Sequence, residues 1–249
     1  MHYSDTWADP AHQQTPAAWS ALSFSNLKAA ALAYTSTIIT EIKPEIVQVG
    51  NEINSGLLWP QANLIQHEAQ SINLISSLCS NIKVQAPTTK VMLHYAGIGA
   101  DATWFFGKMT AVNYDYIGLS YYPIWHGKSI ADLKLTINSL DQTYGKKVLV
   151  AETSYPFTLG FNDFTNNIVG SNDQIIPAFE ASPQGQKNYL LALKTMLQET
   201  QNGIGFYYWG AEWISFKGNQ ATNGSPWENR ALYDFSNKAL PAMDVFLPY

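Results

Sequence analysis

The stretch PEIVQVGNEINSG, residues 44–56, decides the fold. Its β-branched residues Ile46, Val47 and Val49 are typical of a short buried strand, and a charged side chain rarely belongs inside one. Glu52 is therefore expected at the exit of this strand. In α/β proteins ligands bind beyond the carboxyl ends of parallel strands, so Glu52 is a candidate site residue.

Strand and helix patterns alternate along the whole sequence. Strand patterning covers residues 45–49, 90–95, 116–120, 147–151 and 204–209, and helical apolar spacing covers residues 16–43, 61–81, 102–109, 129–145 and 182–203. This alternation predicts a parallel sheet and one α/β domain, residues 1–249, of the (β/α)8 TIM-barrel type. Only about five complete strand–helix units are visible, with the end of a further strand at residues 1–5, so the barrel is expected to be incomplete at its N-terminus.

Composition excludes several classes of partner. Lysine and arginine total 14 against 19 acidic residues, giving a net charge of −5, and no basic run occurs. Nucleic acid is therefore not an expected partner. No apolar run approaches the roughly 18 residues of a membrane span, so no membrane is expected either. The single cysteine, Cys79, lies in an apolar helical pattern and is expected to be a buried thiol.

A second carboxylate repeats the pattern of the first. In KKVLVAETSYP, residues 146–156, an apolar run ends in Glu152. Two such carboxylates, three strands apart in a barrel, would point across the same mouth. Glycosidases need one carboxylic acid that protonates the leaving oxygen and one carboxylate that acts as nucleophile or base. The pair therefore indicates glycoside hydrolysis, and the 8 Trp and 14 Tyr residues supply faces on which sugar rings stack.

Other chemistries lack their motifs. The five histidines show no close metal-ligand spacing, and the sequence has no GxSxG elbow, P-loop or GxGxxG after a strand. A metal-dependent hydrolase, a serine nucleophile and nucleotide chemistry are thus unsupported.

Six motifs, in order, resemble the strand ends of glycoside hydrolase family 53, the endo-β-1,4-galactanases. They are HYSDTWADP (2–10), VQVGNEINSGLLWP (47–60), VMLHYAG (91–97), IGLSYYPIW (117–125), AETSYPFT (151–158) and GFYYWGAEWI (205–214). The resemblance spans the chain and implies a retaining endo-hydrolase of β-1,4-galactan, the side chain of type I arabinogalactan in pectin. It assigns Glu52 as the acid/base and Glu152 as the nucleophile.

The same resemblance implies roles for the neighbouring side chains. Asn51 would bind the 2-hydroxyl of the sugar, and Tyr121 or Tyr122 would hydrogen-bond the nucleophile. Trp209 would form the stacking platform at the cleavage point. Further cleft residues would be Trp59, Trp125 and Trp213, together with the polar His94, Asp101, His2 and Asp5.

The chain departs from the family pattern in two ways. By the resemblance, about two and a half N-terminal βα units are expected to be missing, and with them an arginine that the family places against the nucleophile; Arg230 lies far downstream and does not replace it. The second departure is YYWGAEW, residues 207–213, where many members of the family have Trp-Glu-Pro. The native enzyme is expected to be exported, secreted or periplasmic, and monomeric. An opened barrel would leave sheet edges unpaired, which favours self-association of this chain.

No redox cofactor is expected. The long loop after the fourth strand offers Asp163, Asn166, Asn167 and Asp173 as oxygen ligands for a structural calcium ion, and solvation of a polar loop explains the same residues. Two alternatives to galactan hydrolysis stay open: an inactive carbohydrate-binding fragment, and a related β-1,4-glycanase that acts on xylan or mannan.

Overall fold

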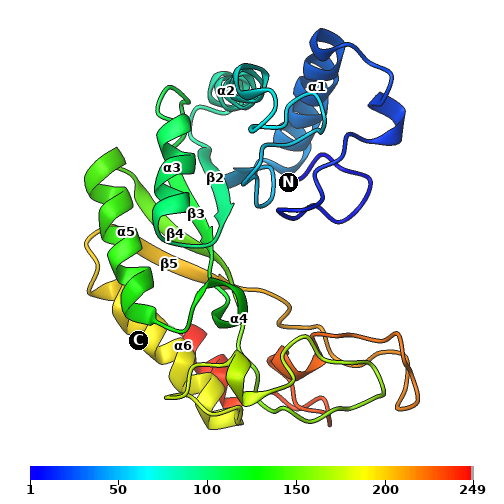
Figure 1. The fold of residues 1–249 in the computed structure, drawn as a ribbon, viewed down its shortest axis with the longest axis vertical. Helices are drawn as coiled ribbons and strands as arrows, with labels where there is room; N and C mark the ends of the chain where they lie inside the picture. Colours follow the sequence, from blue (N-terminus) through cyan, green and yellow to red (C-terminus); the bar gives the residue numbers. More distant parts are fainter. Residues whose placement is uncertain (248–249) are drawn as a thin grey trace. The chain divides into compact units, whose positions relative to one another are not determined.

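The computed structural model describes residues 1–247 and alternates strands with helices along the chain (Figure 1). The strands are β1 (Ile46–Val49), β2 (Lys90–Ala96), β3 (Tyr116–Ser120), β4 (Lys147–Thr153) and β5 (Gly203–Tyr208). The helices are α1 (Phe24–Ile42), α2 (Glu68–Gln85), α3 (Ala100–Lys108), α4 (Pro123–His126), α5 (Ile130–Tyr144) and α6 (Pro183–Gln198). Short 3₁₀ turns are η1 (Ala17–Trp19), η2 (Asn172–Gln174), η3 (Glu228–Arg230) and η4 (Pro241–Phe246).

The five strands form one sheet in the order β1-β2-β3-β4-β5. This confirms the expected fold class, a parallel α/β sheet of the β/α-barrel type. Within the chain two compact units are distinguished: an N-terminal unit of residues 1–120 and 139–149, and a C-terminal unit of residues 121–138 and 150 onward. Among residues 1–247, no helix combines the length and the apolarity that crossing a membrane requires.

In the N-terminal unit, β1, β2 and β3 pair in parallel. Val49 lies opposite Leu93, and Ala96 lies opposite Ser120. Helices α1 and α2 pack together, and each buries one stripe of side chains, such as Leu27 of α1 and Leu78 of α2. Because the three strands run in the same direction, their carboxyl ends bring the segments after Val49, Ala96 and Ser120 to the same edge.

In the C-terminal unit, α6 packs against β5 and η4. Its core contains Tyr155 and Tyr189, whose rings stack with centroids 4.3 Å apart. The buried Thr153 hydroxyl donates to the Tyr121 carbonyl over 2.8 Å and lies 2.7 Å from the Tyr189 hydroxyl. These contacts fix the end of β4, where Glu152 lies.

Three helix predictions need correction. The helix expected over residues 182–203 ends at Gln198, and Gly203 is the first residue of β5. The helix expected over residues 61–81 begins only at Glu68, because the Asn63 side chain accepts hydrogen bonds from the backbone N–H groups of Ile65 and Gln66 and holds a turn there. The helix expected over residues 16–43 divides into η1 and α1, which begins after the Ser23 cap. Strand positions agree with expectation to within two residues at each end.

Candidate active site

Glu52 lies in a tight turn directly after β1. Gly50 has a φ of +76°, and a Cβ atom there would lie 2.3 Å from Ile53 Cγ2, so only glycine fits this approach. Glu52 itself has a left-handed φ of +47°, which is uncommon for a residue other than glycine. The side chain is 9% exposed. The turn therefore holds the Glu52 carboxyl group in a buried position by means of a strained backbone conformation.

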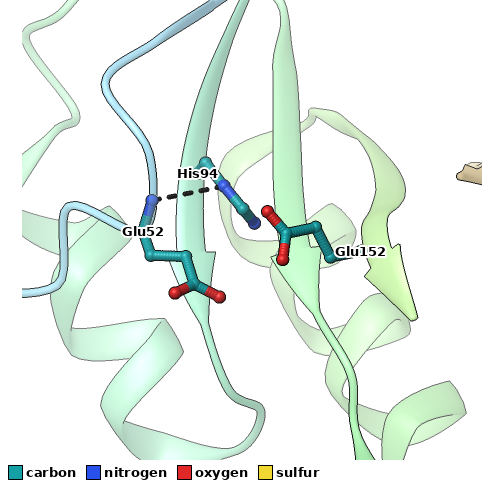
Figure 2. A group of neighbouring side chains, drawn as sticks. All are labelled: Glu52, His94 and Glu152. Carbon is teal, nitrogen blue, oxygen red and sulfur yellow. Dashed lines mark hydrogen bonds between the residues drawn. The ribbon is translucent and has the colours of Figure 1, made fainter. Parts of the chain in front are cut away.

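Three side-chain and backbone groups close a ring of hydrogen bonds around Glu52. Its backbone N–H donates a hydrogen bond to His94 Nδ1 (Figure 2), and the two nitrogen atoms lie 3.2 Å apart. His94 Nε2 lies 2.9 Å from Ser120 Oγ, and the Ser120 hydroxyl donates to Glu52 Oε1 over 2.5 Å. Since Nδ1 is an acceptor here, the ring assigns the proton of His94 to Nε2 and a neutral imidazole.

The surroundings of Glu52 favour its protonated form. Burial raises the pKa of Glu52 above its ordinary value, the Ser120 hydrogen bond lowers it, and the negative charge of Asp9 raises it further. The net shift is upward. A carboxyl group of this kind keeps its proton at a pH where an exposed glutamate has lost it, which is the requirement for a general acid.

Asn51 is fixed beside Glu52 by its own side chain. Its Nδ2 donates to the Ala8 carbonyl over 2.8 Å, and its Oδ1 accepts from Gln48 Nε2 over 3.0 Å. The Asn51 carbonyl also accepts from Gln13 Nε2 over 2.6 Å. The amide is thus held in one orientation by Ala8 and Gln48, and its second Nδ2 hydrogen has no acceptor among residues 1–247.

Glu152 lies near the end of β4 and is half-buried. Its Oε2 accepts a hydrogen bond from the Tyr122 hydroxyl over 2.9 Å. The Tyr121 hydroxyl instead donates to the Gly127 carbonyl over 2.9 Å. Of the two tyrosines that the sequence offered, Tyr122 is therefore the one that contacts this carboxylate, and the buried Tyr121 braces the turn after α4.

An aromatic cluster in the C-terminal unit joins several of the predicted tryptophans. Trp227 is its centre, with ring centroids 5.9 Å from Tyr122, 6.1 Å from Trp125 and 6.2 Å from Trp213. Trp213 in turn lies 5.8 Å from Trp209. Trp125 is 52% exposed, so the cluster reaches solvent.

Sequence reasoning missed both Trp227 and Ser120. Trp227 lies in an irregular segment with no strand or helix pattern before it, so its only signal was a tryptophan beyond the last strand. Ser120 ends a strand that was correctly predicted. A small hydroxyl after two apolar residues gave no reason to single it out.

Several predicted cleft residues have different surroundings. His94 is fully buried and supports Glu52 instead of lining a surface. His2, Asp5 and Asp101 are exposed, and Asp5 accepts a hydrogen bond from the Ala17 N–H over 2.7 Å. Trp59 is half-buried, and its indole N–H donates to the Ser55 carbonyl over 2.9 Å.

The four oxygen-bearing residues proposed for calcium have unequal surroundings. Asp163 is buried, and its two oxygens accept from the Thr165 N–H over 2.6 Å and the Ser215 hydroxyl over 3.0 Å. Asn167 keeps a buried Oδ1 with no partner in residues 1–247, an atom that suits a cation. Asn166 and Asp173 are exposed. Both Asp163 oxygens already accept hydrogen bonds, and two of the other three residues are exposed, so the calcium site stays a prediction.

Comparison with known proteins gives a consistent result. The model of the family described as glycosyl hydrolase family 53 matches residues 1–246. An arabinogalactan endo-beta-1,4-galactanase from Cellvibrio japonicus is 36% identical over 265 residues, which cover 99% of this chain and 70% of that protein. An endo-beta-1,4-galactanase from Bacillus subtilis is 31% identical and covers 99% of this chain and 65% of its own length.

Solved structures agree with this match. The Ignisphaera aggregans GH53 catalytic domain superposes with a TM-score of 0.90 and 38% identity, over 98% of this chain and 71% of that domain. A fungal beta-1,4-galactanase structure superposes with a TM-score of 0.80 and 27% identity, over 98% of this chain and 75% of its own.

Proposed function

Because the chain belongs to glycosyl hydrolase family 53, we propose that it is an endo-hydrolase of the β-1,4-galactosidic bonds in galactan and type I arabinogalactan. The names of its relatives support this substrate. The observation that carries the chemistry is the contrast between its two carboxylates. Glu52 is buried with a raised pKa, whereas Glu152 is half-buried and accepts a phenolic hydrogen bond.

In this proposal the two carboxylates flank the scissile bond. Glu52 follows β1, and Glu152 lies near the end of β4; the carboxyl ends of strands are where β/α-barrel enzymes carry their catalytic residues. Glu52 gives its proton to the leaving oxygen while Glu152 attacks the anomeric carbon, which forms a covalent glycosyl-enzyme and breaks the glycosidic bond. Glu52, now ionised, then takes a proton from water as that water attacks the same carbon and releases Glu152.

The neighbouring groups act on these two residues or on the sugar. The Tyr122 hydroxyl orients Glu152 for attack, and the ring through His94 and Ser120 holds Glu52. Asn51 offers its remaining amide hydrogen to the 2-hydroxyl, where a hydrogen bond strengthens in the transition state. Trp125 and the adjoining aromatic rings provide faces for sugar stacking.

The experiment that tests the roles uses azide and a nitrophenyl β-1,4-galactobioside, whose leaving group needs no acid. In Glu52→Ala the glycosyl-enzyme still forms with release of nitrophenolate, and azide replaces the water that has lost its base, which gives the β-galactobiosyl azide. In Glu152→Ala azide attacks from the vacated side, displaces the nitrophenol and gives the α-galactobiosyl azide. Products are assigned by NMR.

Polysaccharide specificity is tested alongside. The chain is expected to release galacto-oligosaccharides from galactan and no sugars from xylan or mannan. Release of sugars from xylan or mannan, with none from galactan, would contradict the proposal that galactan is the substrate. Tight binding of galactan without any bond cleavage would instead identify a non-catalytic carbohydrate-binding protein.

A further inference from the structure

Arg230 is the single arginine of the chain and one of its most buried side chains, with 1% exposed. Among residues 1–247 it takes part in no salt bridge, and its Nε and Nη2 atoms have no hydrogen-bond partner there. Burying a charge without an acidic partner costs several kcal/mol. A neutral side chain would avoid this cost, so the contacts that the guanidinium does make require an explanation.

The contacts of the guanidinium group connect it indirectly to Glu152. The guanidinium carbon lies 3.3 Å from the ring centroid of Trp227, which is stacking distance. Nη1 donates to the Ser154 hydroxyl over 3.3 Å, and Ser154 is only two residues beyond Glu152. Trp227 in turn contacts Tyr122, the donor to Glu152. Arg230 is therefore connected to Glu152 in two indirect ways: through the rings of Trp227 and Tyr122, and through Ser154 and the backbone between Ser154 and Glu152.

The guanidinium is also charged at neutral pH. Burial lowers the pKa of Arg230 to about 9, while the nearby Tyr122 and Tyr208 phenols favour the charged form. A planar cation is attracted to an aromatic face and is pre-organised to stack on it, which the round ammonium of lysine is not. Tyr122, Ser154 and Arg230 also line one small cavity. A shorter or more flexible side chain at position 230 would give Tyr122 space into which to turn.

We propose that Arg230 is a positioning residue for the nucleophile: by stacking on Trp227 and tethering Ser154, it holds the Tyr122 hydroxyl on Glu152. The inference rests on the proposed role of Glu152. Arg230 touches neither the carboxylate nor the substrate in this role. Its effect on turnover passes through Tyr122.

The test is a double-mutant cycle on galactan. Arg230→Met removes the stack and the tether and is expected to lower kcat about tenfold while KM changes less than about twofold, because alignment of the attacking group is lost. Arg230→Lys keeps the charge without the planar stack and should recover part of the loss. In the Tyr122→Phe background, Arg230→Met should lower kcat by less than about twofold further, since the link that it acts through is already cut.

Gln186→Met is the matched control. Gln186 is fully buried in the same unit and donates to the carbonyls of Tyr155 and Ala231, next to Arg230 in sequence. It is expected to lower the unfolding temperature and leave kcat near the wild-type value. Full additivity of Arg230→Met with Tyr122→Phe, or equal loss of kcat in Gln186→Met, would overturn the proposal. If Arg230→Met does not fold, Arg230→Lys takes its place in the same cycle.

A readout without turnover separates this proposal from the proposed function. If the wild-type chain cleaves no galactan, the proposed function fails, and near-ultraviolet circular dichroism of the aromatic cluster then decides the role of Arg230. Arg230→Met should weaken that signal in the folded protein while Gln186→Met preserves it. An unchanged signal in Arg230→Met would overturn the positioning role.

Discussion

The Tyr122 hydroxyl donates a hydrogen bond to Glu152 Oε2 over 2.9 Å, while the hydroxyl of its neighbour Tyr121 is turned to the Gly127 carbonyl. Two adjacent residues with the same functional group thus have separate tasks. The difference follows from strand geometry, because successive side chains at a strand end point to opposite sides.

Tyr122→Phe is expected to lower kcat on galactan by about tenfold to a hundredfold, because the ring keeps its place while the group that orients the nucleophile is lost. KM should change little. Steady-state kinetics measure both values. Tyr121→Phe is the matched control, with an expected loss of stability and kcat within about threefold of wild type. The reverse ranking of the two variants would contradict the assignment of Tyr122.

Ser120→Ala removes the hydroxyl that lowers the pKa of Glu52 and leaves burial and the Asp9 charge to raise it. The pKa of Glu52 should therefore rise further. If Glu52 is the general acid, the alkaline limb of the kcat/KM profile depends on its deprotonation, and we expect that limb to move to higher pH.

The control for Ser120→Ala is Ser71→Ala. Ser71 is equally buried in the N-terminal unit, and its hydroxyl has no hydrogen-bond partner among residues 1–247. Its removal should leave the pH profile unchanged. A downward shift of the alkaline limb in Ser120→Ala would show that Ser120 does not stabilise the carboxylate form.

The sequence predicted the strands and Glu52 because both depend on local pattern. The β-branched alternation before Glu52 and Glu152 is a signal within about five residues, and it specified where each carboxylate leaves the sheet. The local pattern did not predict which of Tyr121 and Tyr122 donates a hydrogen bond to Glu152. A period of two says that they point apart, but only packing against Gly127 and β4 decides which one faces Glu152.

Side-chain contacts between residues far apart in the sequence were also not predicted. Ser120 contacts Glu52 across 68 residues, and Arg230 contacts Ser154 across 76. No local period encodes such a pair, since it depends on which strands become neighbours and on how far each loop returns. The start of the helix expected over residues 61–81 was wrong for a local reason: the side-chain hydrogen bonds of Asn63 compete with helical bonds there, and the helix begins at Glu68.

Glu52→Gln should stabilise the fold at neutral pH although it abolishes the acid. The folded-state pKa of Glu52 is raised above its ordinary value of 4.5. A raised pKa means that the stability contributed by the protonated group is complete below that ordinary value and is lost as pH rises through the folded-state pKa. Glutamine cannot ionise, so it avoids this loss.

The unfolding temperature of Glu52→Gln should accordingly exceed that of the wild type by an amount that grows as pH rises above the ordinary glutamate pKa. Thermal unfolding followed by circular dichroism measures the difference. Glu68→Gln, at an exposed position on α2, is the control and should show no such growth. A difference that shrinks with rising pH would contradict a raised pKa for Glu52.

Asp163→Ala tests how the two long loops of the C-terminal unit are joined. Asp163 accepts from Thr165 and from Ser215, which lies 52 residues away, and Gly224 packs closely against the same carboxylate. Removing the acceptor leaves buried donors unsatisfied, at a cost of about 1–3 kcal/mol, so the unfolding temperature should fall by several degrees.

Burial raises the pKa of Asp163, but the hydrogen bonds from Thr165 and Ser215 outweigh it and the net shift is downward. The contribution is therefore present above the ordinary pKa and lost as pH falls through the lowered one, so the gap to the wild type should narrow in acid. Asp173→Ala, at an exposed position, should leave the unfolding temperature unchanged. Equal losses in Asp163→Ala and Asp173→Ala that appear only with added calcium would show instead that a shared calcium ion joins the loops.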